Sequence, residues 1–410
     1  MSDRDLDVVV YGATGFVGAL LADYLVRNAP HDARIGLAGR SRDKLERVKA
    51  GLGRAAADWE VVVADAADDA ALAAMAARTR VVATTVGPYA RFGGPLAHAC
   101  AQAGTHYADL TGEVLFHRDS IDANHEAAVA SGAKIVHSCG FDSVPSDLGV
   151  HVLHEAVAAD GAGELTDTTL VVRGSRGGVS GGTIDSLRAQ IEVTSQDRAK
   201  AKVAASPYSL TPDRSAEPDV GAQPDGVVAR ASGIAPHLSG WVAPFVMGPY
   251  NTRVVRRSNA LLDHAYGRRF KYAETVSMGD SPVAPVLGAA MAGGLVGFQK
   301  AMAVGPVRAV LDRVLPSPGD GPGEKTRNSG FFRLQIHGTT STGAHYTATV
   351  AAQGDPGYKA TAVMLGESAL CLAFDDLGDR GGVLTPAVAM GTPLVERLRG
   401  QGFTLEASAD

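Results

Sequence analysis

The residues best suited to bind a ligand form a glycine-rich turn near the start of the chain. Gly12, Gly15 and Gly18 follow the apolar run 6–11 and open a helical pattern over 16–28. In this setting Gly12 permits a tight turn, Gly15 lets the backbone approach a pyrophosphate, and Gly18 allows close helix packing. The N–H groups at the start of the helix attract phosphate, so we predict a dinucleotide site. Its residues in this turn are Gly12, Ala13, Thr14, Gly15, Phe16, Val17 and Gly18.

Basic residues follow the second predicted strand, which covers 35–38. NAD sites usually place an acid here to hold the ribose 2′-hydroxyl. This chain instead has Arg40, with Ser41 and Lys44 close behind. Because a guanidinium can bind a 2′-phosphate with two hydrogen bonds, the sequence predicts NADP(H) rather than NAD. Asp65, after the third predicted strand, is expected near the adenine.

Three loop clusters combine glycine with hydroxyl or acidic side chains, over residues 85–89, 105–113 and 138–147. Each lies near the predicted carboxyl end of a strand, where open α/β sheets bind their ligands. The alternative is ordinary turn chemistry, in which Asp142 and Asp147 are helix caps. The cofactor contacts expected in these clusters are Val86, Gly87, Pro88, Cys139 and Gly140.

A fourth glycine-rich stretch, 174–183, lies between a predicted strand and a predicted helix. Its residues 178–182 match the G-x-S-x-G elbow of α/β-hydrolases, with His337 and His345 downstream. The N-terminal glycine turn disfavours a hydrolase, and a loop at a cofactor or substrate cleft fits better. The substrate contacts expected here are Ser180, Gly182 and Thr183.

Other familiar chemistries find little support. No tyrosine has a lysine four residues later, which disfavours the mechanism of short-chain dehydrogenases. His151 and His154 could share a helix face but lack a third zinc ligand. The three cysteines are far apart and form neither a zinc motif nor a disulfide framework. We therefore predict no metal site.

The elements that must position these residues alternate between strand and helix. Apolar runs recur up to about residue 138 and are separated by helical patterns. This alternation predicts an α/β fold with a doubly wound parallel sheet of Rossmann type. The pattern changes after about residue 146, where a strand over 166–173, a loop-rich stretch over 206–250 and an antiparallel hairpin over 331–351 are expected.

Composition narrows the class of protein. The 410 residues are 45% hydrophobic and 20% charged, which excludes a disordered chain. A net charge of −6 argues against a nucleic-acid surface. No apolar run follows the N-terminal charges, so we expect a cytoplasmic protein without a signal peptide. Residues 283–298 are uncharged but too short to span a bilayer, and form either a buried helix or a surface for an acyl substrate or a membrane.

Several motifs, taken in order, resemble those of the saccharopine dehydrogenase-like oxidoreductases. They are YGATGFVG (11–18), LAGRS (37–41), TVGPY (85–89), YADLTGE (107–113) and CGFDSVPSDLG (139–149). Three later segments resemble the mycobacterial trans-acting enoyl reductases of that family, namely 251–260, 266–270 and 382–391. The resemblance implies a discontinuous architecture. Its parts are an NADP-binding Rossmann domain over 1–146, an inserted mixed α/β substrate domain over 147–354, and a C-terminal segment over 355–410 that returns to the first domain.

The resemblance also implies a reaction. Such proteins reduce the α,β-double bond of a carrier-bound thioester for polyketide synthases that lack an enoyl-reductase domain, in the synthesis of phthiocerol-type lipids and phenolic glycolipids. NADPH gives a hydride to the β-carbon, and the α-carbon takes a proton. The candidate catalytic residues are Tyr89, Asp142 and Ser143, with Tyr89, the Asp142 region or water as the proton donor. N–H groups in the loops 140–143 or 180–183 would stabilise the enolate.

Two alternatives remain open. The first is a saccharopine-type reductase of a polar amino-acid adduct, which would need several cations for its carboxylates. The arginines available for this are Arg253, Arg256, Arg257, Arg268 and Arg269. The second is a non-catalytic, lipid-associated NADP-binding protein. The expected partners are an acyl or polyketide thioester, its carrier protein and a second copy of the chain in a homodimer, but no nucleic acid.

Overall fold

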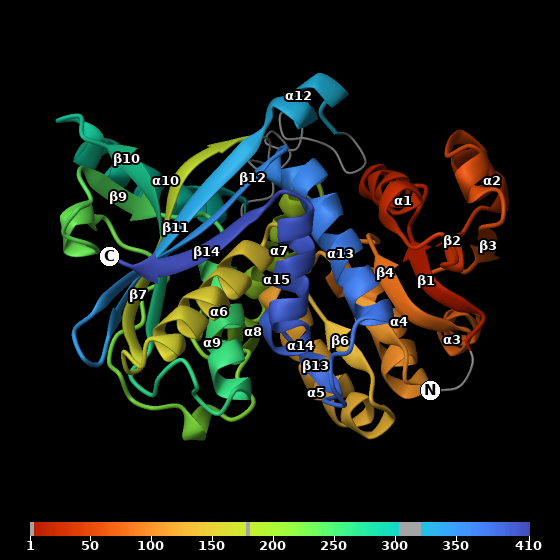
Figure 1. The fold of residues 1–410 in the computed structure, drawn as a ribbon, viewed down its shortest axis with the longest axis horizontal. Coiled ribbons are helices and arrows are strands. Elements are labelled where there is room, and N and C mark those ends of the chain that lie inside the picture. The colour runs from red at the N-terminus through yellow and green to blue at the C-terminus, as the bar shows by residue number, and fades with distance from the viewer. Residues whose placement is uncertain (1–3, 178–180, 303–320) are drawn as a thin grey trace.

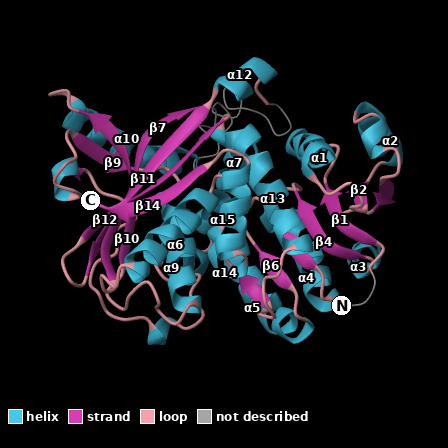
Figure 2. Cartoon of the chain, in the orientation of Figure 1, coloured by secondary structure: helices cyan, strands magenta, loops and turns pink. Residues whose placement is uncertain are grey.

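The expected strand–helix alternation produces a parallel seven-stranded sheet (Figures 1 and 2). The computed structural model describes residues 4–177, 181–302 and 321–410. The strand order is β13-β6-β5-β4-β1-β2-β3, so the doubly wound fold is confirmed. The strands are β1 (Leu6–Tyr11), β2 (Ile35–Gly39), β3 (Glu60–Val63), β4 (Thr79–Thr84), β5 (His106–Ala108), β6 (Lys134–Val136) and β13 (Gly382–Leu384).

Helices cover both faces of this sheet because successive strand residues point to opposite sides. Val8 and Val10 join the core under α1, α2 and α13, whereas Val9 joins the core under α3, α4 and α5. The helices are α1 (Phe16–Asn28), α2 (Arg42–Gly51), α3 (Asp69–Ala77), α4 (Tyr89–Ala103), α5 (Val114–Ser131) and α13 (Thr361–Phe374), with the short η1 (Arg54–Ala56) after α2.

A second seven-stranded sheet is mixed, with the order β14-β12-β11-β7-β10-β9-β8. Only β7 and β10 pair in parallel, and β11 and β12 form the expected hairpin. Its strands are β7 (Leu165–Arg176), β8 (Ala229–Arg230), β9 (Trp241–Pro244), β10 (Lys271–Gly279), β11 (Phe331–Thr340), β12 (His345–Gln353) and β14 (Thr404–Ala409). The helices between and around them are α6 (Val144–Ala159), α7 (Gly181–Gln196), α8 (Arg198–Ala205), α9 (Gly248–Leu261), α10 (Ala284–Met302) and α12 (Glu324–Ser329), with η2 (Arg214–Ala216) and η3 (Ala231–Gly233).

The C-terminal segment divides between the two sheets. Helix α13 packs against α1 and β4, and β13 pairs with β6 at the edge of the first sheet. The last strand differs from the expectation for 355–410, because β14 pairs with β12 of the second sheet. This pairing covers an edge whose N–H and C=O groups would otherwise lack partners. The remaining elements are η4 (Pro356–Ala360), α14 (Pro386–Ala389) and α15 (Gly391–Gly400).

The uncharged stretch 283–298 forms much of α10, which packs against β9 and β10. The interpretation of a buried helix is wrong for its first turns, because Val286 is 69% exposed and Leu287 52% exposed. The stretch therefore presents apolar side chains on the surface. Among the helices of the described residues, none combines the length and apolar character that a bilayer span requires.

Candidate dinucleotide and substrate site

The glycine-rich turn joins β1 to α1 at the carboxyl edge of the first sheet. Gly12 has a φ of +89°, and a Cβ there would lie 2.7 Å from Cγ2 of Val86. A Cβ on Gly18 would lie 2.2 Å from the carbonyl oxygen of Gly12. Neither position therefore accepts a side chain without movement of the backbone or of the loop after β4. In the strand order, β1 lies between β2 and β4, and the chain connections on its two sides run in opposite directions. Open sheets of this type bind ligands in the crevice at that point, and the turn lies there.

Basic side chains lie beside this turn, at the start of α2. Arg40 and Lys44 are exposed, and Arg40 has no ion pair among the described residues. An open cavity of about 440 Å³ is lined by Thr14, Lys44, Arg47 and Val48. These residues fit a dinucleotide that carries a 2′-phosphate, with Arg40 and Lys44 as its cations. Sequence reasoning missed Arg47, which the i, i+3 spacing from Lys44 could have revealed.

Asp65 and the loop after β4 border the same region. Asp65 is exposed after β3, and its Oδ1 accepts a hydrogen bond from the N–H of Ala67 at 3.0 Å. Val86 lies against Gly12, and Pro88 precedes the first residue of α4. The structure thus brings Val86 to the glycine turn, as expected for a residue at the carboxyl end of β4.

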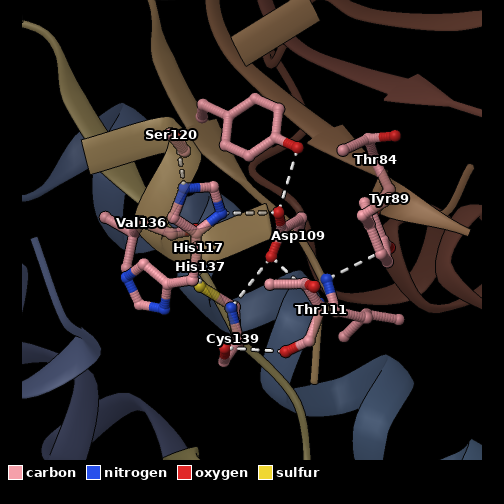
Figure 3. A network of polar contacts seen from close by, with 12 residues as sticks. Thr84, Tyr89, Asp109, Thr111, His117, Ser120, Val136, His137 and Cys139 are labelled. Atoms are coloured by element: carbon pink, nitrogen blue, oxygen red, sulfur yellow. Dashed lines mark hydrogen bonds and ion pairs between the residues drawn. The ribbon is translucent and has the colours of Figure 1, made fainter. Parts of the chain in front are cut away.

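Tyr89 connects the loops that follow β4 and β5 (Figure 3). Its hydroxyl donates to the carbonyl oxygen of Thr84 and accepts from the N–H of Leu110, both at 3.1 Å. Burial raises the pKa of Tyr89 well above its usual value. Because its hydroxyl proton is held by a backbone carbonyl, Tyr89 acts as a positioning residue in this structure, and its expected role as proton donor gains no support.

Asp109 lies at the centre of a buried network (Figure 3). Its carboxylate accepts hydrogen bonds from the hydroxyl of Tyr107, from Nδ1 of His137 and from the N–H groups of Thr111 and Ser138, at 2.7–3.0 Å. Nε2 of His137 in turn lies 2.8 Å from Oγ of Ser120. The network fixes the loops that follow β5 and β6 relative to one another.

Ser138 links this network to α9, which packs against β10 of the second sheet. It has a φ of 65°, a left-handed conformation that is uncommon for a residue with a side chain. Its hydroxyl donates to the carbonyl oxygen of Thr111 and contacts the hydroxyl of Tyr250 on α9. Tyr250 also lies 3.1 Å from Nδ1 of His117. The strained backbone is thus held by contacts from the loop after β5 and from α9, as is typical of functional sites.

Asp142 differs from its neighbours because its carboxyl group has no hydrogen bond or ion pair among the described residues. The residue is half-buried, and desolvation raises the pKa of Asp142 to about 7. A Cβ on Gly112 would lie 3.5 Å from Oδ2 of Asp142 and 3.7 Å from Cε of Met247, just before α9. The carboxyl group therefore lies where the loops after β5 and β6 meet the start of α9.

The other expected residues of this loop are engaged in the core. Ser143 is fully buried and its hydroxyl donates to Oδ1 of Asn251 at 3.1 Å. Cys139 is also fully buried, and its thiol contacts the carbonyl oxygen of Val136. A Cβ on Gly140 would lie 2.6 Å from Leu110. The hydroxyl of Ser143 and the thiol of Cys139 are thus engaged within the protein, and the expected roles of these residues gain no support from their side-chain contacts.

The predicted substrate loop leads into α7. Ser180 lies outside the described residues, and Gly182 and Thr183 belong to the first turn of that helix. Further along α7, Ser186 donates a hydrogen bond to Glu113 at 2.7 Å. The helix is thereby fixed next to the loop after β5. Sequence reasoning did not single out Glu113, although it stands in the motif over 107–113.

The arginines that a polar adduct would require are used elsewhere. Arg256 donates to the carbonyl oxygens of Pro207 and Tyr272, and Arg257 to those of Leu210 and Val383. Arg253 pairs with Asp225 at 2.9 Å. All three arginines are buried on α9 and hold its surroundings together. The two remaining candidates, Arg268 and Arg269, are exposed in the turn before β10.

The glycine turn at the crevice of a parallel sheet, with basic residues after its second strand, defines a dinucleotide-binding oxidoreductase. The family model of the saccharopine dehydrogenase NADP-binding domain matches residues 8–136. A Mycobacterium tuberculosis protein provisionally named a trans-acting enoyl reductase is 52% identical over 99% of this chain and 98% of its own length. The chain belongs to the saccharopine dehydrogenase-like oxidoreductases, in the branch of the mycobacterial trans-acting enoyl reductases, and it binds NADP(H).

Two further comparisons agree with this placement. The trans-acting enoyl reductase of Mycobacterium ulcerans is 49% identical over 99% of this chain and 99% of its own length. Apo saccharopine dehydrogenase (L-Glu forming) from Saccharomyces cerevisiae superposes with a TM-score of 0.55 at 14% identity. That match covers 98% of this chain and 99% of the yeast chain, so the two proteins share the whole fold.

Proposed function

We propose that this protein is an NADPH-dependent trans-acting enoyl reductase. Its substrate would be the α,β-unsaturated thioester of an acyl or polyketide chain held by the carrier protein of a separate polyketide synthase. The saturated thioester that it forms would be built into long-chain lipids of the phthiocerol type and phenolic glycolipids. The observation that carries the proposal is the near-full-length likeness to proteins named trans-acting enoyl reductases. Two groups of Asp142, its carboxyl group and its N–H, support the proposal.

Asp142 is the proton donor in this proposal. When bound, NADPH supplies the hydride that reaches the β-carbon, so the protein must provide a proton for the α-carbon. A carboxyl group with a pKa of about 7 is protonated often enough near neutral pH to act as a general acid. Its lack of hydrogen-bond partners among the described residues leaves the proton free for a substrate.

The backbone N–H of Asp142 is a second group that could act on the substrate, as a hydrogen-bond donor to the thioester oxygen. The N–H of Phe141 donates to Oγ1 of Thr361, and the N–H of Ser143 donates to the carbonyl oxygen of Gly140. The N–H of Asp142 has no acceptor within the part of the chain that the structure describes. We assign it to the negative charge that develops on the thioester oxygen, because preorganised donors lower the barrier of such steps.

The saccharopine-type alternative has less support. A polar adduct with several carboxylates needs free cations near the site, but Arg253, Arg256 and Arg257 are engaged by backbone carbonyls and by Asp225. The exposed apolar side chains at the start of α10, such as Val286, suit a lipid-like chain or a membrane surface better than a polar substrate. We therefore include acyl-chain or membrane contact by α10 in the proposal.

The test is consumption of NADPH by the full-length protein. Enoyl thioesters, presented on coenzyme A and on an acyl carrier protein, are compared with the precursors of saccharopine, because saccharopine itself is already reduced and cannot consume NADPH. The proposal predicts that only the enoyl thioesters are consumed and that the product is the saturated thioester by mass spectrometry. Binding of NADPH without turnover of any enoyl thioester would support the non-catalytic alternative and overturn the proposal. NADPH consumption with the precursors of saccharopine would support the polar alternative.

A further inference from the structure

Three side chains with metal-ligating atoms meet on the second sheet, away from the glycine turn. His237 precedes β9, His337 lies on β11, and Asp410 follows β14. Each offers one ligand atom, and these atoms all lie within 4.8 Å of one another. Nδ1 of His237 is 3.8 Å from Oδ2 of Asp410. In Figure 1 the end of the chain lies beside the segment that leads into β9.

The hydrogen bonds around His337 determine which of its nitrogens is free. Thr347, opposite His337 on β12, donates its hydroxyl proton to Oδ1 of Asp410 at 2.6 Å. A hydroxyl group has only one proton, so Nδ1 of His337, 3.0 Å from Oγ1 of Thr347, must be the donor in that contact. Nε2 of His337 therefore carries the lone pair that a metal ion requires.

Nε2 of His337 is buried and has no hydrogen-bond partner among the described residues. The side chain belongs to a residue that is only 4% exposed. A buried acceptor without a donor costs free energy, which a bound cation would recover.

The ring of His237 is held close to that of His337. Ala235 and Leu238, on either side of His237 in the chain, pack against Val171 of β7. The ring centroids of His237 and His337 are 5.4 Å apart in an edge-on arrangement. His237 itself is exposed, so its side chain can adjust to the distance that a metal ion sets.

The sequence alone predicts no metal site, but the structure brings these side chains together, and we propose that His237, His337 and Asp410 bind a zinc ion. Two imidazoles and one carboxylate are a known donor set for zinc, with the fourth position left to water. Thr347 orients both His337 and Asp410 from outside the coordination sphere, as outer-shell partners of metal ligands commonly do. The ion would join the segment before β9 to the end of β14. The site uses none of the residues at the glycine turn and does not include Asp142.

The test is zinc binding by the full-length protein, without an affinity tag and after treatment with a chelator. Calorimetry should show one Zn²⁺ per chain, and Co²⁺ should give the visible spectrum of a site with nitrogen and oxygen ligands. His237→Ala and Asp410→Asn change exposed residues and should retain the fold. Thr347→Val removes an outer-shell partner and should weaken zinc binding by roughly 10- to 100-fold. His237→Ala and Asp410→Asn each remove a ligand and should weaken zinc binding by more than this.

His31→Ala is the matched control, because His31 is an exposed histidine in the first part of the molecule. Its zinc affinity should equal that of the unmodified protein, and zinc should raise the melting temperature of both. Mg²⁺ should not compete, because it prefers oxygen ligands. The absence of stoichiometric zinc binding would overturn the proposal. Equal affinities of His237→Ala, Asp410→Asn and the unmodified protein would also overturn it, since the ion would then be bound elsewhere.

Discussion

The hydroxyl of Ser186 donates a 2.7 Å hydrogen bond to Oε1 of Glu113. This contact connects α7 to the loop after β5 of the first sheet. The carboxyl group of Glu113 also accepts from the N–H groups of Tyr89 and Ala90, at 2.9 and 2.8 Å. It therefore caps the first turn of α4 while it holds α7. One buried side chain thus positions the loop after β4, the loop after β5 and a helix of the second part.

Substitution of Ser186 should lower the free energy of unfolding less than substitution of Glu113. Ser186→Ala removes one hydrogen bond and should lower it by about 0.5–1.5 kcal/mol. Glu113→Ala should cost more, because loss of a helix cap adds about 0.5–2 kcal/mol. Denaturant unfolding measures both. The control is Ser195→Ala on the same helix, where the hydroxyl has no hydrogen bond among the described residues other than that to the nearby carbonyl oxygen of Glu192. Equal stabilities of Ser186→Ala and Ser195→Ala would show that the contact with Glu113 contributes nothing.

The proposed role of Asp142 predicts a pH-dependent rate. The acid form donates the proton, so kcat should fall as the pH rises through about 7. Asp142→Asn should lower kcat by about 10²- to 10⁴-fold and abolish this dependence, while NADPH affinity stays the same. Asp58→Asn, at an exposed position, is the control. A pH profile that Asp142→Asn leaves unchanged would assign the proton to another group.

Asp142 should also reduce stability at neutral pH. Its pKa is raised in the folded state, so the folded protein binds more protons than the unfolded chain between the two pKa values. The free energy of unfolding therefore falls as the pH rises from about 4 to about 7. Asp142→Asn should unfold at a higher temperature than the unmodified protein at pH 8, with a smaller difference at pH 4. A variant that is less stable at pH 8 would contradict the desolvated environment of this carboxyl group.

Arg40 should decide between the two nicotinamide cofactors. A hydrogen bond to a charged group contributes about 1.5–3 kcal/mol. Arg40→Ala should therefore weaken NADPH binding by roughly 10- to 100-fold, because about 1.4 kcal/mol corresponds to a factor of ten. NADH affinity should not change, and Arg54→Ala, at an exposed residue of η1, should leave both affinities as they are. Equal losses for NADPH and NADH would mean that Arg40 does not contact the 2′-phosphate.

The glycine turn can be tested with two matched substitutions. Gly18→Ala places a Cβ 2.2 Å from the carbonyl oxygen of Gly12, so the turn must shift and NADPH binding should be lost. Overpacking of this kind also costs about 1–3 kcal/mol of stability. Gly51→Ala, at the end of α2, meets no atom within 4 Å and should leave binding and stability nearly unchanged. Fluorescence titration with NADPH compares the two, and tight binding by Gly18→Ala would place the cofactor elsewhere.

Much of the first sheet could be predicted from the sequence, because the residues that specify each of its strands are neighbours in the chain. Buried parallel strands appear as short apolar runs, and Gly12 and Gly18 stand where a side chain has no room. The basic residues after β2 are equally readable, since their place in the chain fixes their place at the sheet edge. The resemblance of the motifs predicted the family, and the comparisons confirm it.

The tertiary structure decided which polar residues are free to react. Tyr89, Ser143 and Asp142 look alike as candidates in the sequence. In the structure, Leu110 and Asn251 engage the first two, and of the three only Asp142 has no hydrogen bond among the described residues. The pairing of β14 with β12 and the meeting of His237 with Asp410 are likewise absent from any local pattern. Sequence periodicity specifies which face of an element is buried, whereas contacts between remote segments depend on how those faces pack.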